Sequence, residues 1–152
     1  MGVAVRGGGV GSRSGGHERR EVIVPSFWME FYDDTRVPAA RRDGDTVRLT
    51  GHTGETAGGA FSADAETQVR QTFRTIGLTL AEAGVSWSDV VELTSYCVGL
   101  RQQAPVLIAV ASEFLVEPYP VWTAVGVTDL WDAEAVVEIS CVAIDRSASA
   151  QG

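Results

Sequence analysis

The chain has 152 residues, of which 45% are apolar. That is enough for one domain with its own hydrophobic core, and too apolar for intrinsic disorder over most of its length. Twelve basic side chains oppose 20 acidic ones, and a formal net charge of −8 repels phosphate backbones, so we expect no nucleic-acid partner. No apolar run is long enough to cross a membrane and no signal-peptide pattern occurs, so we expect no membrane partner and a cytoplasmic location.

Several residue types are absent or scarce, and this excludes classes of chemistry. All 12 basic residues are Arg, so the chain has neither a Schiff-base Lys nor the phosphate-binding Lys of a P-loop. Cys97 and Cys141 lie outside any C-x-x-C spacing, and we expect both to be reduced, buried thiols. His17 and His52 belong to no zinc-binding pattern. The sequence therefore predicts no metal site and no cofactor.

Residues 1–20 hold seven of the 17 Gly and almost no large apolar side chain. Such a composition cannot bury enough surface to offset its ordering entropy, so we expect a flexible tail. The Gly run at 7–11 lacks the G-x-G-x-x-G spacing and follows no strand, which favours a linker over a phosphate-binding loop. We expect the folded domain at 21–146 and a short disordered C-terminus at 147–152.

The domain is expected to begin with two strands. Residues 21–28 form the first, and residues 32–43 a loop with a short extended piece near its end. A turn at 43–45 leads into a β-branched strand at 46–50. This strand stops at Gly51, where the backbone can approach a ligand.

Residues 64–83 carry the clearest helical pattern in the chain. Ser62 or Asp64 is expected to cap its start, and Gly84 follows its end. One apolar stripe runs along one face, formed by Val69, Phe73, Ile76 and Leu80.

The second half alternates strands with one more helix. We expect a strand at 90–98, a helix at 102–114 that starts near Pro105, and strands at 122–127 and 136–144. The order is β-β-α-β-α-β-β, which predicts an α+β fold with two helices on one face of one sheet. Apolar residues lie on both sides of the last strand, so we expect oligomerisation to cover a second surface.

Several motifs, in this order, resemble the Rid (RidA/YjgF) superfamily, and within it the branch named for YjgH. The similarity covers roughly Ser26 to Arg146. The segments that carry it are V-R-L-T-G-H-T-G at 47–54, Gln68, L-x-x-A-G at 80–84, D-V-V at 89–91 and Y-P-V-W-T-A-V-G-V at 119–127.

Membership in that family implies a chorismate-mutase-like fold, one mixed sheet with two helices on one face. It also implies a homotrimer, with three clefts between subunits that bind a small-molecule ligand. The best-known activity of the family is hydrolysis of reactive imines and enamines to a ketoacid and ammonia. We expect these properties of the present chain.

The resemblance assigns candidate site residues one by one. Glu138 matches the glutamate proposed to position or activate water, so it is the candidate catalytic residue. Thr50 matches the cleft serine, and Gly51 keeps the backbone amide beside it. Three substrate-binding positions are altered, because Trp122 replaces the carboxylate-binding Arg, Ile108 the Asn and Ala124 the Cys. Indole carries no positive charge, so the usual grip on a carboxylate is absent there.

Each candidate has an ordinary structural alternative. Glu138 could be a solvated edge residue, and Trp122 a core aromatic instead of a pocket wall. His52 could donate to a ligand or shuttle a proton near neutral pH, or be a solvated loop histidine. Tyr32 could fold over the cleft or simply pack. The acidic run at 129–134 is interpreted as a solvated loop.

Two functions remain open. The first is an enzyme that hydrolyses or processes an imine, enamine or similar small electrophile, with Glu138 orienting water. The second is a trimer of the same fold that binds a metabolite for sensing or protection without catalysis. A ribonuclease is disfavoured by the acidic charge and the lack of Lys.

Overall fold

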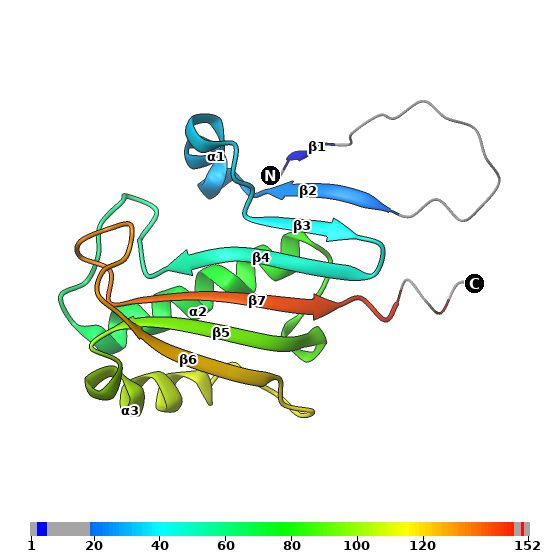
Figure 1. Ribbon diagram of the computed structural model, residues 1–152. Helices are drawn as coiled ribbons and strands as arrows, with labels where there is room; N and C mark the ends of the chain where they lie inside the picture. The colour runs from blue at the N-terminus through cyan, green and yellow to red at the C-terminus, as the bar shows by residue number, and fades with distance from the viewer. Residues whose placement is uncertain (1–2, 6–18, 148–149, 151–152) are drawn as a thin grey trace.

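The computed structural model describes residues 3–5, 19–147 and 150 (Figure 1). Its centre is one seven-stranded sheet in the order β1-β2-β3-β4-β7-β5-β6, in which only β5 and β6 pair in parallel. The strands are β1 (Val3–Val5), β2 (Arg20–Val24), β3 (Ala40–Asp43), β4 (Thr46–Thr53), β5 (Val90–Val98), β6 (Val121–Val127) and β7 (Val137–Ile144). The helices are α1 (Met29–Thr35), α2 (Ala65–Glu82) and α3 (Leu100–Ala111), with short 3-10 turns at Ser26–Trp28 and Trp87–Asp89.

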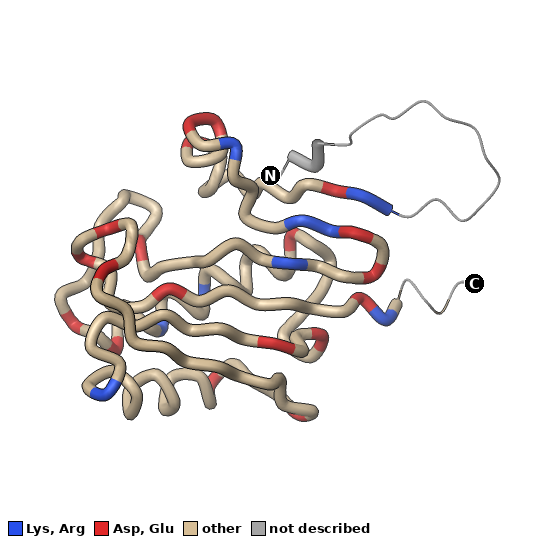
Figure 2. The backbone as a smooth tube through the Cα atoms, viewed as in Figure 1, with Lys and Arg blue, Asp and Glu red and all other residues tan. Residues whose placement is uncertain are grey.

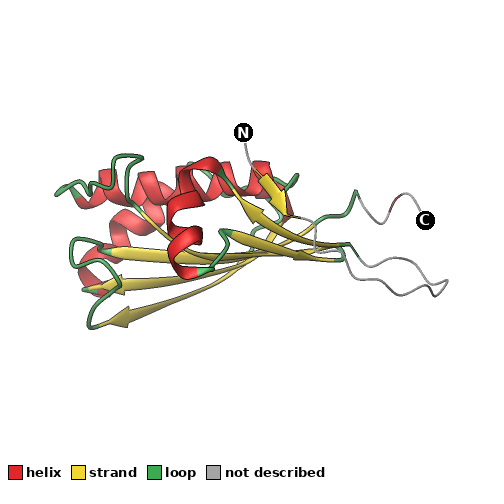
Figure 3. Ribbon diagram, turned by 90° about the horizontal axis from the view of Figure 1, so that it is seen from above, coloured by secondary structure: helices red, strands yellow, loops and turns green. Residues whose placement is uncertain are grey.

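The helices lie in one layer against the sheet (Figure 3). Contacts of α2 reach β4 and β7, whereas α3 lies over β5 and β6. The opposite face of the sheet carries no helix within the described residues. This confirms the expected α+β fold, with one mixed sheet covered on one face.

Burial on β7 alternates because successive side chains of a strand point to opposite faces. Val137, Ile139, Cys141 and Ala143 are buried under the helices, and the alternate residues from Glu138 to Ile144 are half-buried on the open face. The predicted stripe of α2, from Val69 to Leu80, is fully buried against this sheet. Burying one such side chain contributes about 1.5–3 kcal/mol, so this layer fixes which residues reach the open face.

The start of the domain differs from the expected single strand at 21–28. β2 ends at Val24, because Pro25 has no N–H to continue the ladder. The following residues form a 3-10 turn and α1, which ends at Thr35 and is capped by Arg36 in the left-handed region with φ of 64°. Within this segment Trp28 packs on Phe31 and on His52 of β4, which anchors the segment to the sheet.

The second helix also differs from expectation. α3 begins at Leu100, directly after Gly99, whose φ of 70° turns the chain off the end of β5. Pro105 therefore lies inside the helix and does not start it. The helix ends at Ala111, three residues earlier than expected.

The chain ends lie largely outside the described residues. Val3–Val5 pair with β2 as an edge strand, whereas the rest of the expected tail before Arg19 is not described. Of the expected disordered C-terminus at 147–152, Ser147 donates its backbone N–H to Asp145 and residues 148–149 and 151–152 are not described. Among the helices in the described ranges, none is long and apolar enough to cross a membrane.

A buried guanidinium joins the two ends of the domain. Arg42 on β3 is fully buried and donates to the Asp145 carboxylate at 2.9 Å and to the Ala83 carbonyl at 2.6 Å. A buried charge is tolerated only when it is paired and hydrogen-bonded. This contact ties β3, the end of α2 and the segment after β7 together.

Candidate functional site

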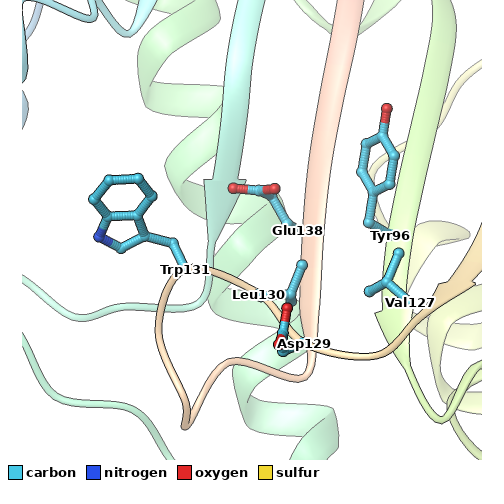
Figure 4. A pocket seen from close by; sticks show the side chains of 6 residues that line it. All are labelled: Tyr96, Val127, Asp129, Leu130, Trp131 and Glu138. Carbon is cyan, nitrogen blue, oxygen red and sulfur yellow. The ribbon is translucent and has the colours of Figure 1, made fainter.

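Glu138 lines an open hollow of about 480 Å³ on the helix-free face of the sheet. It lies on β7 directly opposite Tyr96 on β5. Figure 4 shows the carboxylate between Tyr96 and Trp131. The remaining walls are Val127, Asp129 and Leu130, from the end of β6 and the loop that follows.

Gly51 on β4 makes room for this carboxylate. A Cβ atom at residue 51 would lie 2.7 Å from both Cγ and Cδ of Glu138, closer than any side chain tolerates. The glutamate side chain therefore lies across bare backbone at the bulged part of β4. The expectation that the strand stops at Gly51 is wrong, because β4 continues through Gly51 to Thr53. The group that lies against the Gly51 backbone is the Glu138 side chain of the same chain and not a ligand.

The surroundings of Glu138 disfavour its charged form. Partial burial is the main cause that raises its pKa from the ordinary value of 4.5, and the nearby charge of Asp132 adds to it. A raised carboxyl pKa favours proton acceptance and release near the working pH, as a general base requires. Figure 2 shows the acidic residues in red on β7 and on the loop between β6 and β7.

That loop is held by one buried amide. Gln68 on α2 donates its Nε2 to the carbonyls of Glu134 at 2.9 Å and Ser62 at 3.1 Å. Its Oε1 accepts the backbone N–H of Val136 at 2.6 Å. Residues 129–134, interpreted from the sequence as a solvated loop, thus form a tethered wall of the hollow.

Trp131 is the most exposed large side chain of this wall, with 83% of its surface accessible. It meets Phe31 of α1 edge-on, with ring centroids 6.5 Å apart. Phe31 in turn contacts Trp28 edge-on at 5.3 Å, and Trp28 stacks on His52 at 4.6 Å. An aromatic row therefore leads from the protein interior to the rim of the hollow.

His52 departs from both sequence-based interpretations, since its ring is fully buried and is neither in a solvated loop nor facing a ligand. Nδ1 lies 2.6 Å from the Thr50 carbonyl and Nε2 lies 2.8 Å from Thr79 Oγ1. Because a carbonyl only accepts, Nδ1 carries the proton. Burial lowers the His52 pKa to about 4, so the ring is neutral at physiological pH and does not shuttle protons there.

Two further candidates are occupied elsewhere. The Thr50 hydroxyl donates to the Pro38 carbonyl at 2.6 Å and so fixes the segment before β3. Tyr32 lies half-buried on α1 and lines neither of the two hollows described here. The Thr50 hydroxyl is therefore already engaged within the protein, and Tyr32 lies outside both hollows.

The remaining candidates meet in a second, smaller hollow of about 180 Å³ between β6 and α3. Trp122 and Ala124 come from β6, and Ile108, 63% exposed, comes from α3. The other lining residues are Leu100, Ala104 and Leu107. The Trp122 indole N–H donates to the buried Ser95 hydroxyl at 2.8 Å, so it is not free to bind a ligand.

The two hollows open on opposite sides of the sheet. Tyr96, Val125 and Glu138 share the open face, whereas Trp122 pairs with the buried Leu93 on the helix side. Within one chain the structure therefore brings Glu138 to Gly51, and Trp122 to Ile108 and Ala124, but does not join the two groups.

Sequence reasoning missed part of the site. Tyr96 and Trp131 line the larger hollow and Gln68 holds its wall, yet no role in a site was assigned to them. A tryptophan inside an acidic loop is an unusual exposure of apolar surface, and this signal could have identified Trp131. Within the described part of the chain, no group of three or more His, Cys, Asp or Glu side chains is arranged to hold a metal ion.

Comparison with known proteins identifies the class. The family model described as Endoribonuclease L-PSP matches residues 36–145, most of the folded domain. The chain therefore belongs to this family, which is the Rid (RidA/YjgF) superfamily that its motifs resemble.

One relative matches over almost its whole length. The RutC family protein YjgH of Escherichia coli (strain K12) is 35% identical over 125 residues, which cover 82% of this chain and 94% of the relative. The solved structure of protein YJGH superposes with a TM-score of 0.73 at 35% identity, covering 82% of this chain and 95% of that chain. The expected resemblance to the YjgH branch is thus confirmed.

Two further solved structures have the same fold. Rv2704 of Mycobacterium tuberculosis, described as a member of the YjgF/YER057c/UK114 family, has a TM-score of 0.73 at 26% identity, covering 83% of this chain and 99% of that chain. RidA of the Antarctic bacterium Psychrobacter sp. PAMC 21119 has a TM-score of 0.68 at 30% identity, covering 71% of this chain and 87% of that chain.

Proposed function

We propose that this protein hydrolyses a reactive imine or enamine, with Glu138 as the base that activates water. The observation that carries the proposal is the half-buried Glu138 carboxylate with a raised pKa, held over Gly51 in an open hollow. Family membership supports the reaction class, because imine hydrolysis is the best-known activity of Rid proteins.

The reaction requires one base, one water molecule and the imine. Glu138 accepts a proton from water as the water oxygen bonds to the imine carbon, and the π electrons move to nitrogen. The nitrogen receives that proton, which gives a carbinolamine. The carbinolamine hydroxyl then loses its proton and the amino nitrogen gains one as the C–N bond breaks, so that a carbonyl compound and ammonia leave. Positioning of the water and the C=N carbon beside one carboxylate provides most of the rate enhancement.

We further propose that the working site forms between subunits of a homotrimer. The Glu138 hollow of one subunit and the Trp122 hollow of the next would face each other across the contact. Two features support this arrangement, the separation of the hollows on opposite faces and the exposed apolar side chains of β6, where Val121 is 70% accessible.

Glu138→Gln tests the catalytic assignment, with Glu92→Gln as the matched control. Glu92 is an exposed glutamate of the neighbouring strand β5, outside the hollow. We expect Glu138→Gln to lower ammonia release from freshly generated imines by about a hundredfold, the usual contribution of a general base. The rate of the parent should fall as pH decreases through the raised Glu138 pKa, because only the ionised carboxylate accepts a proton.

A binding protein without catalysis is the second candidate. The apolar lining of the Trp122 hollow favours it, since Trp122, Ile108 and Ala124 stand where the family resemblance leads us to expect Arg, Asn and Cys. For a binding protein we expect a ligand to raise the melting temperature, and ammonia release to be the same in the parent and in the Glu138→Gln variant. That result would show that the hydrolase proposal is wrong.

A further inference from the structure

We propose that the site selects imines without a carboxylate group, in which an apolar substituent enters the Trp122 hollow and the C=N nitrogen, neutral or as iminium, lies in the Glu138 hollow. This inference rests on the proposed function and names its substrate class. Two independent features of the structure lead to it.

The first feature is that no lining side chain of the Trp122 hollow offers a free donor. Its lining side chains are all apolar, and the single polar atom of Trp122 is already bonded to Ser95 inside the protein. A carboxylate placed there would lose its water and gain neither a positive charge nor a hydrogen bond from a lining side chain, which is unfavourable. An apolar substituent loses nothing on entry and gains contact with the indole and with Ile108.

The volume of this hollow gives the size of that substituent. An apolar cavity of about 150 Å³ in a protein interior accommodates benzene. The Trp122 hollow measures about 180 Å³ and is open to solvent. It therefore fits a phenyl ring or a branched alkyl group of similar size.

The second feature is the chemistry of the Glu138 hollow. Its lining includes the carboxylates of Glu138 and Asp129 and the rings of Tyr96 and Trp131, and none of its six lining residues is basic. Carboxylates attract a cation, and the faces of indole and phenol do so as well. This hollow repels a substrate carboxylate and favours an iminium nitrogen.

Together the hollows separate substrates by charge. In the reaction R₂C=NH + H₂O → R₂C=O + NH₃, neither R group carries a carboxylate. Water adds to the carbon, and Glu138 takes one water proton and passes it to nitrogen, which gives the carbinolamine R₂C(OH)NH₂. Glu138 then takes the hydroxyl proton and passes it to the amino nitrogen as the C–N bond breaks, so that the C=O bond forms, ammonia leaves and the carboxylate is regenerated. The reaction needs no further reactant.

A matched pair of probes tests binding without turnover. Benzylamine and benzoate have the same ring and opposite charge at neutral pH. We expect benzylamine to bind the wild-type protein about tenfold or more tightly than benzoate, measured by calorimetry at low salt, since charge-assisted contacts favour only the cation. Equal affinities, or tighter binding of benzoate, would overturn the inference whether or not the protein is a hydrolase.

A matched pair of imines tests turnover. Oxidation of phenylalanine and of phenethylamine generates two imines that differ only in the carboxylate. We expect Glu138-dependent ammonia release to be about tenfold or more faster from the phenethylamine imine. Faster Glu138-dependent hydrolysis of the phenylalanine imine would overturn the inference and keep the hydrolase. No Glu138-dependent hydrolysis of either would overturn the hydrolase, and the binding pair would still decide the inference.

Two variants connect the selectivity to Trp122. Trp122→Arg places a guanidinium in the hollow and should shift the preference about tenfold toward benzoate and the phenylalanine imine. Trp122→Phe removes the indole N–H and part of the ring area but keeps an uncharged aromatic side chain, so it should retain the preference for benzylamine. If Trp122→Arg fails to fold, the comparison of benzylamine with benzoate on the wild-type protein still decides the inference. Loss of the benzylamine preference in Trp122→Phe would contradict it.

Discussion

At the level of single residues, Gly51 determines where the Glu138 carboxylate lies. Gly51→Ala would place a Cβ 2.7 Å from Glu138 Cγ and Cδ, so the glutamate side chain must move away. We expect ammonia release to fall by about tenfold to a hundredfold, since a small misplacement of a catalytic group costs that much. Steady-state kinetics and the melting temperature, measured on the same preparation, check this.

Gly58→Ala is the control for the same substitution. A Cβ at residue 58 would meet nothing closer than Thr56 Oγ1 at 4.0 Å, and its backbone is not in the left-handed region. Activity and melting temperature should therefore stay at the parental values. If Gly51→Ala were as active as Gly58→Ala, the position of Glu138 over the β4 backbone would not matter for the reaction.

His52 makes stability depend on pH. The folded protein holds the pKa near 4, whereas the unfolded chain protonates the ring near 6.5. The unfolded state therefore binds more protons between these values, and the stability present above pH 6.5 is lost as pH falls toward 4. We expect about 2 kcal/mol to be lost between pH 7 and pH 5 in urea unfolding.

The variant His52→Gln isolates this contribution. Glutamine does not titrate, so the pH dependence of the unfolding free energy should be flatter by that amount, whatever its effect at pH 7. Parallel curves for the two proteins would show that His52 titrates alike in the folded and unfolded states, contrary to its burial.

At the level of elements, α2 determines the shape of the loop between β6 and β7 through Gln68. Gln68→Leu leaves the Val136 N–H and the Glu134 carbonyl without partners, which costs about 1–3 kcal/mol for each buried group that stays dry. We expect lower stability, faster hydrogen exchange at the Val136 amide and slower ammonia release, because the loop carries Trp131 and Asp132.

Gln71→Leu on the same helix is the control. The Gln71 amide makes one long local contact, 3.4 Å from Thr75 Oγ1, and reaches no loop. It should leave Val136 exchange and the activity unchanged. If the Val136 N–H stayed protected from hydrogen exchange in Gln68→Leu, a group other than the Gln68 side chain would hold the loop.

At the level of the whole molecule, the separation of the two hollows predicts that subunits complement one another. Glu138→Gln inactivates one half of the proposed site, and Ala104→Trp fills the other half, since Ala104 lines the Trp122 hollow. The two variants are mixed in equal amounts, unfolded and refolded together. About a quarter of the subunit contacts in the closed ring then combine an intact Glu138 hollow with an intact Trp122 hollow, so about a quarter of the parental activity should return. Ammonia release and the mass of the assembly measure this.

Each variant refolded alone is the control and should remain inactive. A mixture as inactive as its components, with the assembly intact, would place both halves in one subunit and contradict the intersubunit site. A monomeric protein with full activity would do the same.

The sequence predicted the parts of this fold in which local pattern and burial agree. The strand at 90–98 has the same bounds in the structure, and α2 carries its expected cap at Asp64 and its expected apolar stripe. It failed at α1 and at the start of α3. At α1 the sequence predicted a strand up to Trp28 and a loop from Tyr32, and at α3 it placed the helix start near Pro105 instead of directly after Gly99.

For the candidate site as well, the sequence pattern predicted some features and the folded chain determined the others. Periodicity predicted five of the seven strands and the two covering helices, and the motifs identified the family, whose resemblance makes Glu138 the candidate catalytic residue. Chain folding alone determined that His52 is sealed beneath Trp28, that Trp122 donates its N–H to Ser95, and that the two hollows open on opposite faces. The physical reason is that residue type and spacing fix which side of a strand a side chain takes, whereas its burial, its partners and its pKa depend on segments far along the chain that only the tertiary structure brings together.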